Sequence, residues 1–184
     1  VLYLTGYLTK DIRQPLQGKT KAFLKIPNAE IMDIFRKSVV RWFDEQIAVR
    51  DRSSLFIALW NEDVSSLSEL ISDLLFETIS YHDYAESFYH AFLAGLFTNA
   101  GYIVESNYES GLGRPDLVIK NKKKRQAVII EIKIADSMQS LQKSAEKAMD
   151  QIDDMRYADG ISAQGYQKVI KYGASFYQKN CLIS

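Results

Sequence analysis

Residues 113–133 read GRPDLVIKNKKKRQAVIIEIK, and this stretch decides the fold of the second half of the chain. Two apolar segments, LVI and AVIIEI, flank a polar cluster that contains three consecutive lysines. A polar cluster between two such segments is typical of a hairpin turn. Strands that are apolar on both faces are usually covered on both faces by helices. The stretch therefore predicts a β-hairpin inside a sheet that helices cover on both sides.

The position of the turn also predicts the register of this hairpin. Folding the two strands about the middle of NKKKR places Asp116 opposite Glu131, and directly opposed residues have Cβ atoms about 4.5–5.5 Å apart. Lys133 lies two residues beyond Glu131 and so points to the same face. That face also carries Val118, Ala127 and Ile129, and the opposite face carries Leu117, Ile119, Val128, Ile130 and Ile132.

Two carboxylates that face each other in a partly covered surface need a positive charge to offset their repulsion and their loss of solvent. They repel, and loss of solvent adds several kcal/mol per ion. A divalent cation such as Mg²⁺ compensates directly, because it prefers carboxylate oxygen ligands. The ammonium of Lys133 could then orient a metal-bound water, whose pKa the metal lowers. The spacing alone leaves a second interpretation open, in which Asp116, Glu131 and Lys133 form a small salt-bridge cluster at a hairpin end.

The remaining periodicity predicts a mixed α/β unit behind a helical leader. Helical spacing recurs over 26–49, 64–80, 83–101 and 137–158. Strand patterns occupy 102–108, 115–120, 126–135, 168–178 and 181–184. The order over 79–184 is thus helix, three strands, helix, strands, and residues 1–78 are expected to form a mostly helical leader or linker.

Composition narrows the class of protein. The formal net charge of zero argues against a strong, general binder of polyanions. The single cysteine, Cys181, excludes an internal disulfide and favours a reducing, cytoplasmic location. No apolar segment reaches the roughly 18 residues that a membrane span needs, so no membrane is expected as a partner. The chain opens at Val1 inside an apolar segment, so we expect it to be part of a longer protein.

The motif GRPDLVI followed by EIK resembles the PD-(D/E)XK nuclease superfamily. The resemblance implies a restriction-endonuclease-like core of helix, three strands, helix and strand, with a central mixed sheet flanked by helices. More narrowly, LYLTGYLT and ESFYH make the chain similar to the nuclease-like C-terminal half of bacterial proteins whose N-terminal half is an AAA-type ATPase. This implies that residues 1–78 are the tail of a missing ATPase module and 79–184 the nuclease-like domain. The chain has no GxxxxGK[ST] phosphate loop, so ATP binding is not assigned to it.

The same resemblance assigns roles by position. It implies that Asp116 and Glu131 ligate Mg²⁺ or Mn²⁺, that Lys133 handles the attacking water, and that Glu86 of the first core helix is a further ligand. Glu86 could instead be the third residue of a helix that Asp83 caps. Gln151 is the candidate for a supporting glutamine from the second core helix, or else an ordinary helix residue. Some related proteins carry a tyrosine four residues after that glutamine, where this chain has Met155; Tyr157 lies six residues after it.

Basic residues near the motif are candidates for contacts with nucleic acid, because Lys and Arg neutralise phosphate charge. Arg114, Lys122 and Lys124 are the candidates, although a solvated turn would have the same composition. His90, one helical turn after Glu86, is a candidate to support Glu86 or a structural histidine.

The expected function is a magnesium-dependent nuclease that hydrolyses phosphodiester bonds, with DNA favoured over RNA as substrate. The alternative is a weakly active or inactive nuclease-fold module that binds nucleic acid or a protein partner and serves an attached ATPase. A third hypothesis is a purely structural or regulatory appendage of that ATPase.

Overall fold

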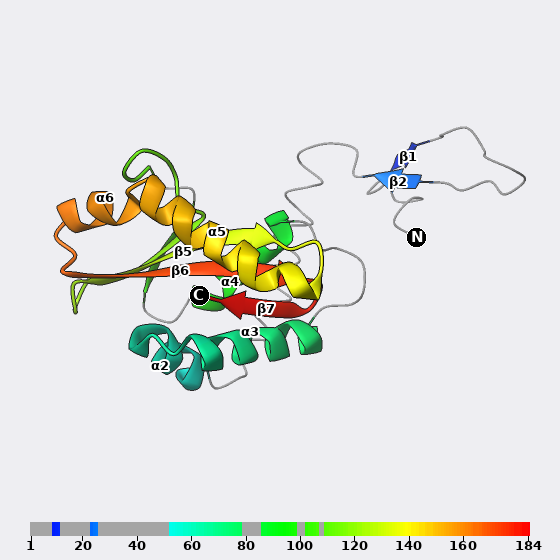
Figure 1. Cartoon of the computed structure of the whole chain (residues 1–184), viewed down its shortest axis with the longest axis horizontal. Helices are drawn as coiled ribbons and strands as arrows, with labels where there is room; N and C mark the ends of the chain where they lie inside the picture. Colours follow the sequence, from blue (N-terminus) through cyan, green and yellow to red (C-terminus); the bar gives the residue numbers. More distant parts are fainter. Residues whose placement is uncertain (1–8, 12–22, 26–51, 79–85, 99–101, 107–108) are drawn as a thin grey trace, which may run out of the picture. The chain divides into compact units, whose positions relative to one another are not determined.

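The computed structural model describes residues 9–11, 23–25, 52–78, 86–98, 102–106 and 109–184, and the chain divides into two compact units, residues 1–43 and 44–184. In the first unit, β1 (Thr9–Asp11) and β2 (Phe23–Lys25) form an antiparallel pair (Figure 1). The helix predicted over 26–49 and the predicted cap Asp83 lie outside the described residues.

The second unit is built on a five-stranded mixed sheet in the order β3-β4-β5-β6-β7. The strands are β3 (Ile103–Ser106), β4 (Leu117–Asn121), β5 (Gln126–Ile134), β6 (Lys168–Tyr177) and β7 (Asn180–Ile183). Strands β5 and β6 pair in parallel, and the other neighbours pair antiparallel. The predicted restriction-endonuclease-like α/β class, with a mixed sheet flanked by helices and a helical segment before the strands, is confirmed.

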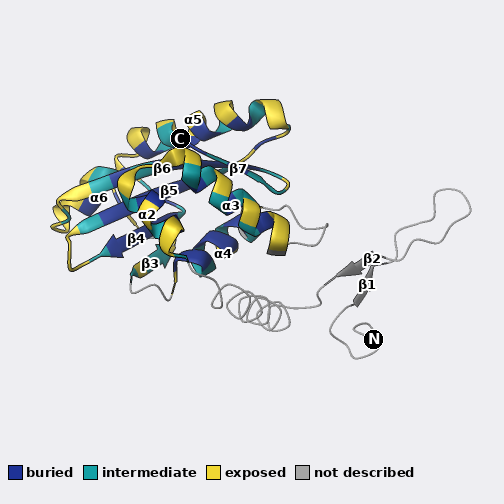
Figure 2. Ribbon diagram, turned by 90° about the horizontal axis from the view of Figure 1, so that it is seen from below, coloured by how far each residue is buried: buried dark blue, intermediate teal, exposed yellow. Residues whose placement is uncertain are grey.

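Helices cover both faces of this sheet, and its central strands β4, β5 and β6 are accordingly largely buried (Figure 2). One face carries α5 (Leu141–Asp154) and α6 (Tyr157–Ala163), where Ile152, Tyr157 and Ile161 pack on Val118, Ala127 and Ile129 of the hairpin. The other face carries α2 (Ser53–Asn61) and α4 (Glu86–Phe97), where the ring of Tyr89 stacks on Phe176 and the hydroxyl of Tyr172 donates to the carbonyl oxygen of Leu59. Both apolar faces of the hairpin are thus covered.

The register of the hairpin is the predicted one. Leu117 pairs with Ile130 and Asn121 pairs with Gln126, so Asp116, one residue before β4, lies at the level of Glu131. The polar segment between the strands forms the turn, and Arg125 takes a left-handed conformation with φ of 52°. The lysine-rich segment therefore forms the turn, and the position of the turn determines which side chains of the two strands face each other.

The helix predicted over 137–158 is interrupted. Ser137 caps a short 3-10 turn, η1 (Met138–Ser140), before α5 begins, and the helix is broken at Arg156, whose φ is 53°, before α6. The carbonyl oxygen of Met155 accepts a hydrogen bond from the amide of Leu112 at 2.8 Å. Because a distant turn takes this carbonyl, the helix ends there, which the local sequence pattern does not reveal.

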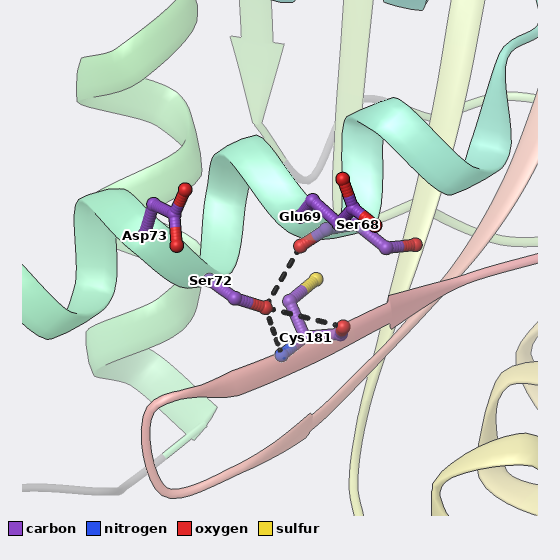
Figure 3. A pocket seen from close by; sticks show the side chains of 5 residues that line it. All are labelled: Ser68, Glu69, Ser72, Asp73 and Cys181. Atoms are coloured by element: carbon purple, nitrogen blue, oxygen red, sulfur yellow. Dashed lines mark hydrogen bonds between the residues drawn. The ribbon is translucent and has the colours of Figure 1, made fainter.

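Helix α3 (Val64–Thr78), which was predicted over 64–80, closes the free edge of β7 (Figure 3). The hydroxyl of Ser72 accepts a hydrogen bond from the amide of Cys181, and that of Ser68 accepts one from the amide of Ile183, both at 2.9 Å. Covering an edge in this way prevents pairing with strands of other molecules. A pocket of about 400 Å³ lies along this contact, lined by Ser68, Glu69, Ser72, Asp73 and Cys181.

The thiol that lines this pocket is not activated as a nucleophile. Cys181 is buried, and burial raises the pKa of its thiol, so the nucleophilic thiolate is disfavoured.

Helices α2 and α3 lie in the same compact unit as the sheet, although both precede residue 79. Periodicity did not predict α2. Within the described ranges, no helix has the length and apolar composition that a membrane crossing requires.

Candidate metal and catalytic site

The structure brings Asp116, Glu131 and Lys133 together at one end of the hairpin. Glu131 belongs to β5, and its side chain is only 3% exposed. The ammonium of Lys133 donates to Glu131 Oε1 at 3.1 Å. Asp116 Oδ2 accepts a hydrogen bond from the amide of Ile132 at 2.9 Å, which holds this carboxylate against the residue that follows Glu131. Two carboxylates and one ammonium from two adjacent strands thus share a site.

The site contains two carboxylates and only one ammonium, so its charges do not cancel. Burial, and next the charge of Asp116, raise the pKa of Glu131, and the hydrogen bond from Lys133 opposes the increase. The Oε2 atom of Glu131 is buried and has no hydrogen-bond partner among the described residues. A buried carboxylate oxygen without a partner is costly. The salt bridge to Lys133 therefore satisfies only part of the cluster, and the remaining negative charge suits a cation.

The carboxylates fit a hard divalent ion. Asp116 is half-buried and Glu131 is buried, so together they present oxygen donors in a partly sheltered position. Residues 52–78, 86–98, 102–106 and 109–184 contain no group of three or more His, Cys, Asp or Glu side chains that could hold a metal. A metal here would accordingly have Asp116 and Glu131 as its ligands from the hairpin, with other positions open to water, substrate or a further ligand.

Helix α5 forms the wall of the site beside Glu131. Gly173 of β6 pairs with Glu131, and a Cβ atom at Gly173 would overlap the carbonyl oxygen of Ala145 in α5. Glycine is needed here because the helix backbone lies directly on the sheet. The next residue on the same face of β6, Ser175, pairs with Lys133; its hydroxyl is buried and has no hydrogen-bond partner within the described part of the chain.

Asp116 is also held from the opposite side of the sheet. His90 of α4 donates from Nε2 to the carbonyl oxygen of Asp116 at 2.7 Å. The hydroxyl of Ser106, in β3, lies 3.2 Å from the same nitrogen. The sequence contained a weak signal for this contact, because His90 lies one helical turn after Glu86. Nothing in the sequence identified Asp116 as its partner.

The candidate residues on the helices differ in how far they are buried. Glu86 is the exposed first residue of α4, and Gln151 is half-buried near the end of α5. Tyr157 is buried, and its ring lies against Gly113 near the start of the motif, whereas Met155 is 38% exposed.

The basic candidates are not all near the carboxylates. Arg114 is exposed and forms a salt bridge with Glu109. Lys122 and Lys124 lie in the turn at the opposite end of the hairpin. Asn121, the last residue of β4, lies five residue steps beyond Asp116, so these lysines lie roughly 17 Å or more away, at about 3.4 Å per residue.

Residues 84–184 match the family model of the PD-(D/E)XK nuclease superfamily. The matched region begins just before α4 and includes the whole five-stranded sheet, the carboxylate pair and Lys133. No curated protein matches the chain.

Proposed function

Because this chain belongs to the PD-(D/E)XK nuclease superfamily, we propose that it hydrolyses phosphodiester bonds of nucleic acid with the help of Mg²⁺ or Mn²⁺. The observation that carries the proposal is the buried Oε2 atom of Glu131, which lacks a partner within the described ranges while a second carboxylate, Asp116, and an ammonium, Lys133, lie beside it.

Each of the three side chains has a proposed role. Asp116 and Glu131 would hold the ion, which when bound supplies Lewis acidity and lowers the pKa of a coordinated water. Lys133 is 32% exposed and so can reach both Glu131 and a water in the open part of the site. Its ammonium would orient that water by donating a hydrogen bond, and Glu86 and Gln151 are proposed to complete the site from α4 and α5.

We propose DNA as the substrate, with Arg114 contacting phosphate near the site after exchanging its partner Glu109 for the nucleic acid. Lys122 and Lys124 would contact the backbone farther along the bound strand. An ATPase module in the same longer chain is the proposed partner, on the similarity of LYLTGYLT and ESFYH.

Cleavage of matched DNA and RNA substrates, with Mg²⁺, Mn²⁺ or EDTA, tests this function. Asp116→Asn, Glu131→Gln and Lys133→Ala should each lower the cleavage rate by at least about 10²-fold, as expected when a positioned charge is removed from an active site. Exposed residues of α5 provide matched controls: Glu146→Gln and Lys147→Ala should cleave like the parent chain. Equal cleavage by the parent chain and all three site variants would refute the proposal.

A binding module without turnover is the second candidate. It is favoured by the salt bridge that Arg114 makes with Glu109 and by the distance of Lys122 and Lys124 from the carboxylates. It predicts that the chain binds labelled nucleic acid with equal affinity in Mg²⁺ and in EDTA, and that calorimetric titration with Mn²⁺ releases no heat. The nuclease proposal predicts Mn²⁺ binding that Asp116→Asn weakens.

A further inference from the structure

We infer that His90 is a positioning residue for the carboxylate pair, and that its hydrogen bond to the main chain of Asp116 sets the metal affinity of the site. This inference rests on the proposed function. His90 itself would contact neither metal nor substrate; it acts through Asp116.

The main chain of Asp116 needs such a support. The described pairing between β3 and β4 ends with Ser106 and Leu117, so Asp116 lies one residue beyond it. The preceding residue, Pro115, is buried and has no amide hydrogen to donate. His90 Nε2 donates to the carbonyl oxygen of Asp116 at 2.7 Å, which places the ring proton on Nε2.

Two hydrogen bonds therefore fix Asp116. His90 holds its carbonyl oxygen, and the amide of Ile132 holds its carboxylate through Oδ2 at 2.9 Å. The first restrains the backbone of Asp116 and the second restrains its side chain. Without His90, the carboxylate would have to hold the peptide in place through Ile132 and bind a cation as well. Supports of this kind commonly change metal affinity or activity 10–100-fold when they are removed.

The alternative is that His90 merely attaches α4 to the sheet. That helix has other attachments: the ring of Tyr89 stacks on Phe176 with centroids 4.4 Å apart, and the hydroxyl of Tyr89 donates to the carbonyl oxygen of Gln178 at 2.6 Å. Leu93 and Leu96 of the same helix are also completely buried. Docking of α4 is thus secured without His90, whereas no other side chain of the described residues donates a hydrogen bond to the Asp116 carbonyl.

The same helix supplies a matched control. Tyr89→Phe removes a hydrogen bond between α4 and the main chain at Gln178 but leaves Asp116 untouched. His90→Ala and His90→Phe remove the donor to Asp116, the second with ring volume retained. His90→Gln keeps an N–H donor of similar reach. Each variant of the full chain would be measured for Mn²⁺ affinity by calorimetry without nucleic acid, for Tm in EDTA, and for the cleavage rate.

The inference predicts that His90→Ala and His90→Phe bind Mn²⁺ about 10–100-fold more weakly than the parent chain, and that His90→Gln recovers most of this loss. Tyr89→Phe should lower Tm without changing Mn²⁺ affinity. Parent-like Mn²⁺ affinity in His90→Ala or His90→Phe would overturn the inference while leaving the proposed function intact. Equal loss of affinity in His90→Gln and His90→Ala would overturn it too. If the parent chain neither bound Mn²⁺ nor cleaved, the proposed function would fail, and the role of His90 with it.

Discussion

Replacing Glu131 by glutamine should stabilise the protein when no metal is present. Glu131 is 2% exposed, its Oε2 atom has no partner among the described residues, and it faces the charge of Asp116. The amide has nearly the same shape, still accepts the hydrogen bond from Lys133 through its oxygen, and carries no charge. The substitution therefore removes the repulsion and the desolvation cost at once.

The size of the effect follows from burial. An unsatisfied buried polar group costs about 1–3 kcal/mol, and a charged one costs more. The substitution recovers the difference, together with the repulsion from Asp116, because the amide nitrogen that replaces Oε2 is still a buried polar group. Part of this gain is offset because Glu131 and Lys133 lose their ion pair, so we expect a net stabilisation of about 1–3 kcal/mol. In a chain of this length each kcal/mol moves Tm by about 2–4 °C, which gives an increase of roughly 2–12 °C.

The gain should depend on pH in a defined direction. Burial and Asp116 raise the pKa of Glu131 above its ordinary value of 4.5, so the folded state binds this proton more tightly than the unfolded state does. The contribution of Glu131 to stability is then greatest below the ordinary value and is lost as the pH rises through the raised pKa. The difference in Tm between Glu131→Gln and the parent chain should be small near pH 4 and should widen towards about pH 8.

Metal should reverse the order of stability. A ligand at one thousand times its Kd stabilises the folded state by about 4.1 kcal/mol, more than the expected effect of the substitution, and this gain should belong to the parent chain and largely vanish in Glu131→Gln. The assay is thermal unfolding in EDTA and in saturating Mg²⁺, with Glu146→Gln, an exposed residue of α5, as the matched control. A Glu131→Gln variant that is less stable than the parent in EDTA at neutral pH would contradict the presence of an uncompensated buried charge at Glu131.

Two further substitutions test how the framework supports the site. Gly173→Ala should lower stability by about 1–3 kcal/mol, measured by denaturant unfolding, because the added methyl group would displace α5 from the sheet at Ala145; an unchanged unfolding midpoint would contradict the close contact. Ser72→Ala should cost about 1–3 kcal/mol and accelerate amide hydrogen exchange at Cys181, because that amide loses its acceptor. The control Ser65→Ala, in the exposed first turn of α3, should leave exchange at Cys181 unchanged.

The hairpin was predictable because its determinants are local. The polar cluster between two apolar strands fixes the turn, the turn fixes the register, and the period of two then places Asp116, Glu131 and Lys133 on one face. The order of the later elements followed in the same way, from changes of period along the chain.

The features that were missed depend on contacts between distant residues. The helix predicted over 137–158 ends early because Leu112 takes the carbonyl of Met155. The pairing of Gly173 with Glu131 arises in a parallel ladder whose register no short turn determines. The bond from His90 to Asp116 joins a helix to the strand two elements later. The sequence thus predicted which charged groups lie together on the hairpin, and the tertiary fold shows which contacts hold them in place.

Anomalous diffraction from crystals of the chain soaked in Mn²⁺ tests most directly whether the carboxylate pair is a metal site. We predict a peak within ligand distance, about 2–2.6 Å, of oxygen atoms from both Asp116 and Glu131, and no such peak in Asp116→Asn crystals. A map without density between these two side chains at saturating Mn²⁺, or with manganese bound only elsewhere, would contradict the account.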